Sequence, residues 1–187
     1  FAFDEQQGLF DFDPFLVDVI DISSGNLIDS SSSLSPGVIV EGEINSHFLN
    51  FDPNQQSLGP PLTLAGGITF EDEIVALSVT PDALDGSDDL LGLDDVIYPT
   101  GVIDESGQNR RGLGFGEVDP DFFEFLTIVD SNTLEVELTA LKAIDQIRVI
   151  TSPDPGNVVV QSVPEPAPIL GLLLFGVLGI GGMLLPA

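Results

Sequence analysis

The sequence predicts a mainly β protein: an antiparallel β-sandwich or jelly-roll domain followed by one C-terminal transmembrane helix. Between residues 27 and 160 apolar and polar side chains alternate with a period of two, which is typical of strands with one buried face. Turn-forming Gly, Pro, Asn and Asp separate these alternating runs. No charged residue follows Glu165, so the end of the chain has a different, fully apolar character.

The first 30 residues are predicted to form an acidic and aromatic arm outside the β-domain. In residues 10–22 apolar side chains alternate with Asp, as expected for an edge strand or for an arm laid over a partner. The serine run at 30–33 predicts a loop, and the β-domain itself is expected to span 31–162.

Alternation within the β-domain predicts about six to eight short strands. In the first of them, Val38 and Val40 are expected on the core face and Ile39 on the other face. The acidic run 71–73 interrupts the second and predicts a bend or bulge in mid-strand. Asp130-Ser131-Asn132 between two alternating runs predicts a hairpin. The clearest expected strands lie at 37–51, 67–79, 122–129, 133–139, 145–151 and 157–161.

Residues 169–186 are uncharged and predict a transmembrane helix. A helix over residues 169–185 is about 25 Å long, close to the roughly 30 Å of the hydrocarbon core. The prolines of the linker 163–168 force extended backbone and separate this helix from the domain. Small residues favour close packing between membrane helices. The positions expected to pack in this way are Gly171, Gly176, Gly179 and Gly182.

The sequence Val163-Pro164-Glu165-Pro166, followed by a helix rich in glycine and leucine, resembles the PEP-CTERM sorting signal of exported bacterial proteins. Exosortase-type membrane enzymes recognise and process that signal. The resemblance implies a single-pass bacterial membrane protein with most of the chain periplasmic or extracellular. In that family an arginine-rich cluster follows the helix, whereas no basic residue follows Met183 here. Two alternatives stay open: a tail that is sorted, and a helix that is retained in the membrane.

A second resemblance covers roughly residues 30–151. It is to a family of uncharacterised exported bacterial proteins that end in PEP-CTERM helices, and it implies a compartment without implying a reaction. The segments that carry it are 46–53, 67–74, 84–92, 98–101, 111–113 and 145–151.

Charge and composition exclude several classes of function. With 31 acidic against 4 basic residues the formal net charge is -27, which excludes nucleic acid as a default partner. The absence of cysteine excludes zinc fingers, thiol nucleophiles and disulfide scaffolds. The expected partners are the lipid bilayer and membrane protein subunits, reached through the helix and the exported domain.

The densest acidic segment is the candidate metal site. Carboxylates are the oxygen ligands that calcium prefers, but the spacing here is not that of an EF-hand. The favoured interpretation is a solvated loop whose Asp side chains cap turns, and calcium binding is the alternative. The candidate ligands are Asp82, Asp85, Asp88, Asp89 and Asp94, with Asp95 beside them.

The remaining polar motifs predict structural roles. Ser46 and His47 are adjacent in a strand, so their side chains point to opposite faces and cannot share a proton. We expect Asp145 and Arg148 to form a local charge pair. The pair Arg110-Arg111 is expected to be either a docking point or an internal counterion, and 112–116 lacks the lysine of a phosphate-binding loop.

These observations predict a non-catalytic exported β-domain, tethered by one helix, that serves as a structural or docking subunit on the periplasmic face of a membrane complex. A photosynthetic or respiratory assembly is one example. The first alternative is a cell-surface or matrix protein sorted by an exosortase. A secreted hydrolase that uses paired carboxylates is the remote alternative, because no acidic pair stands out from solvated strand faces.

Overall fold

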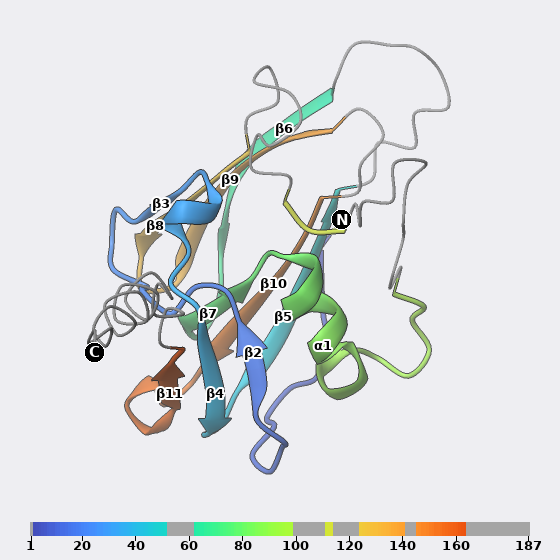
Figure 1. The fold of residues 1–187 in the computed structure, drawn as a ribbon, viewed down its shortest axis with the longest axis vertical. Coiled ribbons are helices and arrows are strands. Elements are labelled where there is room, and N and C mark those ends of the chain that lie inside the picture. Colours follow the sequence, from blue (N-terminus) through green and yellow to red (C-terminus); the bar gives the residue numbers. More distant parts are fainter. Residues whose placement is uncertain (1, 52–61, 99–110, 114–123, 141–144, 164–187) are drawn as a thin grey trace, which may run out of the picture.

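The computed structural model describes residues 2–51, 62–98, 111–113, 124–140 and 145–163. Within these ranges the protein is mainly β, and its strands pair antiparallel in three sheets, consistent with a β-sandwich (Figure 1). The predicted fold class is confirmed at this level. No helix of the described ranges is long and apolar enough to cross a membrane. The predicted helix 169–186 and its four glycines lie outside the described residues.

The central sheet has the order β1-β5-β10-β7, the outer sheet β3-β8-β9-β6 and the small sheet β11-β4-β2. The strands of the central sheet are β1 (Ala2–Asp4), β5 (Asn45–Phe51), β10 (Asp145–Ser152) and β7 (Glu73–Ser78). Those of the outer sheet are β3 (Leu27–Ile28), β8 (Phe125–Asp130), β9 (Thr133–Ala140) and β6 (Leu62–Thr69). Those of the small sheet are β11 (Val159–Ser162), β4 (Gly37–Glu41) and β2 (Phe15–Val17). The helical elements are η1 (Ser31–Ser33), α1 (Pro81–Leu91) and η2 (Pro155–Asn157).

Strand β10 runs through the middle of the molecule, and all eight of its residues are buried. Its apolar side chains separate by face: Ile147 and Val149 join the larger hydrophobic cluster with the outer sheet, whereas Ile150 joins a smaller cluster. The smaller cluster contains Phe15 of β2 and Leu91 of α1. The central sheet is therefore covered by the outer sheet on one face and by α1 and the small sheet on the other.

The hairpin around Asp130-Ser131-Asn132 is confirmed as β8 and β9. In β9 the buried residues Leu134 and Leu138 alternate with exposed glutamates, as the period of two predicts. The expected strands at 145–151 and 157–161 correspond to β10 and β11. These predictions held because both alternation and the turn signal are local.

Two predicted long strands are wrong, since each is a pair of strands. Residues 37–51 divide into β4 and β5 at Gly42, where φ is +134° and a Cβ would lie 2.8 Å from the Val158 Cα. Because of this break, the core face of β4 is the opposite of the predicted one: Ile39 is fully buried, whereas Val38 and Val40 are half-buried.

The acidic run 71–73 likewise ends one strand and begins another, instead of bending a single strand. The chain leaves the outer sheet at the end of β6 and enters the central sheet as β7.

The N-terminal 30 residues are distributed over the whole fold. Strand β1 is an edge of the central sheet, β2 an edge of the small sheet and β3 an edge of the outer sheet. Only β2 lies within residues 10–22, so the edge-strand alternative expected for that segment is confirmed for β2. The expected loop at 30–33 contains the short helix η1.

Candidate functional site

The acidic segment that the sequence suggests as a loop is mostly helix. Thr80 is the N-cap of α1 and accepts a hydrogen bond from the Ala83 amide, and Pro81 occupies the first helical position. Asp18 supports this start, because its carboxylate accepts hydrogen bonds from the Val79 and Thr80 amides at 2.6 and 2.7 Å. One face of the helix, which includes Leu84 and Asp88, is buried. The prediction of a solvated loop is therefore wrong for residues 81–91.

Helix α1 meets the central sheet through a buried arginine. Arg148 of β10 is fully buried and donates two hydrogen bonds to the Glu5 carboxylate, from Nε at 2.7 Å and from Nη2 at 2.8 Å. It also donates to Ser87 Oγ at 2.6 Å and to Asp88 Oδ1 at 3.0 Å, both on α1. Burial lowers the pKa of Arg148, but Glu5 and then Asp88 raise it above its usual value. The predicted local pair between Asp145 and Arg148 is wrong, because residues three apart in one strand have side chains on opposite faces.

A second buried arginine completes the network. Arg111 holds the Asp88 carboxylate with both terminal nitrogens, and it binds Asp85 Oδ1 at 2.6 Å. Its Nε donates to Gln146 Oε1 at 2.7 Å. Of the two roles expected for this arginine, the internal counterion is the one observed, and Arg110 lies outside the described residues. We call Glu5, Asp85, Asp88, Arg111 and Arg148 the buried ionic network.

Gly112 is needed to place Arg111. Its φ is +86°, and a Cβ at this position would lie 2.3 Å from the Val79 carbonyl oxygen. The close approach lets the Leu113 amide donate to that same oxygen at 2.8 Å. Gly112, the first residue of segment 112–116, therefore allows the chain to pack closely against the Val79 backbone.

Two aromatic rings pack against the guanidinium groups. The Phe48 ring centroid lies 5.3 Å from the Cζ of Arg148 and 5.9 Å from that of Arg111. Tyr98 packs edge-to-face on Phe48, with a centroid separation of 5.2 Å. Burial, and next the neighbouring Glu5, raise the pKa of Tyr98 to about 12. Both rings lie within 6 Å of the two guanidinium groups, where a cation is attracted to the electron-rich face of an aromatic ring.

The network joins parts of the chain that the sequence keeps far apart. Three carboxylates face two guanidinium groups, so its formal charge is -1. Removing one member of such a buried set is costly, because an uncompensated charge remains. All five members have partners within the protein, and the network connects α1 and β10 with Glu5, the residue that follows β1.

His47 is the centre of a second polar group. It lies on β5, its Nδ1 is 2.7 Å from Asp4 Oδ1, and its Nε2 is 3.0 Å from Thr151 Oγ1. Ser46, its neighbour, points to the opposite face and donates to Glu5. The prediction that Ser46 and His47 cannot work together is therefore confirmed.

The order Asp4, His47, Thr151 is that of a catalytic triad with threonine as nucleophile. A cavity of about 440 Å³ lies beside it and is lined by Asp4, His47, Asn45 and Asp72, but not by Thr151. Thr151 is 0% exposed. A nucleophile has to be reached by its substrate, so the buried Thr151 does not form a functional triad with His47 and Asp4. The three side chains connect β1, β5 and β10 instead.

Two buried carboxyl groups lie on the other side of β10. Asp145 is 1% exposed and Glu124 is 7% exposed. Neither oxygen of Asp145 has a hydrogen bond of normal geometry in the described part of the chain. Burial, and next the Glu124 carboxylate, raise the pKa of Asp145 to about 8. Asp145 is thus largely protonated at neutral pH.

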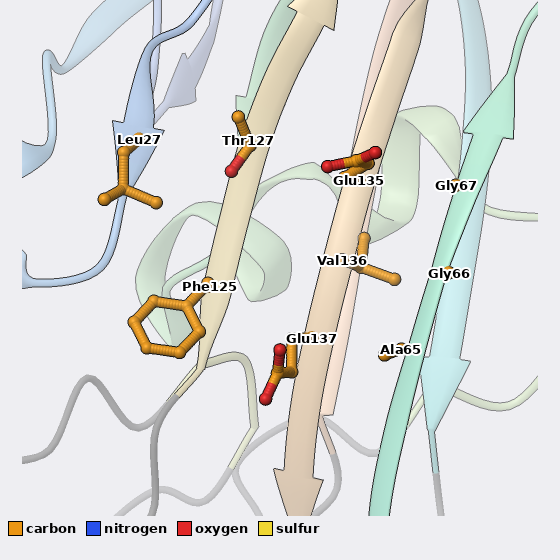
Figure 2. Close-up of a pocket in the computed structure, with 9 residues that line it drawn as sticks. All are labelled: Leu27, Ala65, Gly66, Gly67, Phe125, Thr127, Glu135, Val136 and Glu137. Carbon is orange, nitrogen blue, oxygen red and sulfur yellow. The ribbon is translucent and has the colours of Figure 1, made fainter.

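Among the described residues one face of the outer sheet is exposed, and a cavity of about 520 Å³ lies on it. Figure 2 shows the residues that line this cavity. Glu135 and Glu137 project from β9 between the side chains of β8 and the small residues of β6. Ala65 pairs with Glu137 and Gly67 with Glu135, so the glutamates lie beside positions with little or no side chain. Residues 65–67, Glu135 and Glu137 are exposed, and we call this surface the glutamate face.

The predicted calcium ligands are divided by this geometry. Asp85 and Asp88 belong to the buried ionic network, whereas Asp82, Asp89 and Asp94 are exposed. Within the described ranges no group of His, Asp and Glu side chains is arranged to hold a metal ion.

Sequence reasoning missed most of the buried ionic network. No local sequence pattern marks four of the residues that form or surround the network, because each is a single polar or aromatic residue in an ordinary strand or loop. These residues are Glu5, Gln146, Phe48 and Tyr98. The Thr80-Pro81 start of α1 was the signal that could have been used, since it combines an N-cap residue with proline at the first helical position.

Comparison with known proteins finds no matching family model, no matching curated protein and no matching solved structure. The contacts, charges and open surfaces described above are therefore what a functional assignment can rest on.

Proposed function

We propose that the protein is a non-catalytic β-domain, exported and tethered by its C-terminal helix, that docks other subunits on the periplasmic face of a membrane complex. The observation that carries the proposal is the buried ionic network. Both described arginines, Arg111 and Arg148, are fixed in it and are unavailable for chemistry at the surface. A domain built in this way is a rigid scaffold with open sheet faces.

The most triad-like group supports the same assignment. His47 is fixed between Asp4 and a threonine with no exposed surface. Glu124 and Asp145 are two interacting carboxyl groups, but both are buried, whereas a glycosidase pair has to flank a substrate. These features favour a docking role over hydrolysis.

The tether is proposed from the sequence. The uncharged segment 169–186 has the length of a membrane span, and its glycine strip suits packing against another membrane helix. A formal charge of -27 also favours export, because the cytoplasmic leaflet is anionic and repels such a domain.

The experiment is extraction of the full chain from its native membrane in a gentle detergent, followed by identification and quantification of co-purifying chains. Wild-type protein should recover a stable set of membrane subunits. Gly179→Leu should lose them without a change in the melting temperature of the β-domain, because a bulky side chain blocks close helix packing. Leu174→Ile, which keeps the bulk of the segment, is the matched control. Recovery of the wild-type protein alone from membranes would overturn the docking assignment.

A second candidate function is favoured by the Val163-Pro164-Glu165-Pro166 sequence, which resembles a sorting signal. In that version the tail is processed and the domain belongs to the cell surface or the extracellular matrix. Mass spectrometry of the mature protein separates the two, since sorting predicts a cleaved tail in an extracellular fraction and tethering predicts residues 169–186 intact in the membrane fraction.

A further inference from the structure

We infer that the open edge of β6 is a docking site for an extended segment of a partner protein that carries Lys or Arg at alternate positions. The inference rests on the proposed docking function and names its surface and the chemistry of its partner. It arises from three features of the outer sheet: an unprotected strand edge, small side chains along that edge, and the glutamate face behind it.

Strand β6 has one side paired with β9, and no described strand pairs with the other side of its residues 64–69. Its eight residues pair with β9 without a register shift. The strand contains no charged residue and no proline. Natural edge strands are usually short, bulged, charged or interrupted by proline, because these features prevent pairing with another chain. β6 has none of these protections.

Other edges in the described fold are shorter or covered. β1, β2 and β3 have three residues or fewer, and β11 has four. Strand β7 is covered by residues 18 and 19, since the Val19 and Leu77 amides each donate to the other residue's carbonyl oxygen at 3.1 and 3.0 Å. Residues 64–69 of β6 are therefore the longest open edge in the described part of the chain, and strand addition is a known mode of peptide binding at such edges.

The glutamate face selects the chemistry of the added strand. An added strand would lie about 4.8 Å from β6 and roughly 9.6 Å from β9. Its side chains on the open face would lie opposite Ala65 and Gly67, which leave the space above β6 empty (Figure 2). Long basic side chains can cross that space and reach Glu135 and Glu137. Because these glutamates are two residues apart on one strand, the complementary cations are also two residues apart.

A second copy of the chain fits this surface less well. Pairing two β6 edges would place the same small, uncharged residues opposite each other and would leave all four glutamates without cations. Two domains of the same strong negative charge also repel each other. Charge complementarity therefore favours a basic partner strand over self-association.

The test uses the full chain in detergent micelles and a synthetic, end-blocked decapeptide that alternates valine with lysine. Binding is measured by fluorescence anisotropy, and hydrogen exchange of the amides is followed by mass spectrometry. The peptide should bind and slow exchange within residues 64–68. The same peptide with glutamine in place of lysine should bind about tenfold more weakly.

Variants separate the glutamate face from the overall charge. Glu135→Gln with Glu137→Gln should weaken binding of the lysine peptide about 5- to 10-fold. Glu41→Gln with Glu73→Gln removes the same charge from other exposed strand positions, and it should change binding less than about twofold. Gly67→Lys should abolish the slowed amide exchange of residues 64–68, because the new lysine side chain occupies the space that the side chains of the partner strand need. An added Cβ at Gly67 meets only the Glu135 Cγ at 3.8 Å, so this variant should fold.

Two results would overturn the inference. One is equal weakening by the two glutamine pairs, which would mean unspecific attraction to an acidic protein. The other is concentration-dependent protection of 64–68 without peptide, which would mean that a second copy occupies the edge. If partner subunits co-purify with the wild-type chain and the peptide does not bind, the docking function stands and this surface is wrong. If the peptide binds at β6 and no subunit co-purifies, the surface stands and the docking function fails.

Discussion

Arg148 forms a two-pronged ion pair with Glu5, a residue 143 positions earlier in the chain, and both side chains are buried. The pair connects the central strand β10 with the residue that follows edge strand β1. Asp88 of α1 binds the same guanidinium group, so one side chain holds the N-terminal region, the helix and the middle of the sheet together. This arrangement makes the domain a pre-organised scaffold, which suits docking.

Replacing Arg148 with Met should lower the free energy of unfolding by about 3–5 kcal/mol, because the Glu5 carboxylate then stays buried without a cation. Adding Glu5→Gln should restore part of the loss by removing that charge. Urea denaturation followed by circular dichroism measures both changes, and the exposed Glu73→Gln serves as control. Equal stability of Arg148→Met and wild type would show that the network contributes nothing to the fold.

The buried Asp145 predicts a specific pH dependence. Burial and then Glu124 raise the pKa of its carboxyl group from 3.8 to about 8, so the folded state binds more protons than the unfolded state between these values. Its contribution to stability is fully present below the unfolded pKa and is lost as the pH rises through about 8. Asp145→Asn should remove up to roughly 1.4 kcal/mol per pH unit from the slope of stability between pH 5 and 8.

Unfolding curves at several pH values measure this slope. The exposed Asp95→Asn should leave it unchanged. A slope in Asp145→Asn as steep as in the wild-type protein would contradict the protonated state assigned to Asp145.

Two glycines provide a matched test of backbone geometry. Gly112→Ala should destabilise the protein by about 2–4 kcal/mol, because φ is positive and the Cβ collides with the Val79 carbonyl. Gly86→Ala in α1 should stabilise it by up to about 1 kcal/mol, since nothing lies within 4 Å of its added Cβ. Thermal unfolding of both variants gives the comparison. Similar effects of the two substitutions would contradict the position of Gly112 against Val79.

Calcium should have no specific effect on the melting temperature. Asp85 and Asp88 are bound by Arg111, and a cation at the acidic segment would have to replace that arginine. The melting temperature should match in millimolar calcium, in a chelator and in sodium chloride of equal ionic strength. A saturable rise with calcium that disappears in Asp82→Asn with Asp89→Asn and Asp94→Asn would contradict this expectation.

Much of the fold was predictable from the sequence because alternation and turns are local. The hairpin of β8 and β9 depends on residues close together in the chain, and β10 is rich in β-branched residues, which favour strands. Helix α1 was hidden because Asp, Gly and Ser are weak helix formers and only its cap and its packing favour a helix. The partners of Arg148 could not be predicted, since they come from positions 60 or more residues away.

The most direct measurement compares the subunits recovered with three full-length proteins extracted gently from the native membrane. These are the wild-type chain, the Glu135→Gln and Glu137→Gln variant, and the Glu41→Gln and Glu73→Gln control, with each recovered chain quantified by mass spectrometry. The account predicts that the wild-type chain and the control recover the same subunits in equal amounts, and that the Glu135→Gln and Glu137→Gln variant recovers several-fold less. Equal recovery by all three proteins would contradict docking through the glutamate face, and recovery of no subunit by any of them would contradict docking itself.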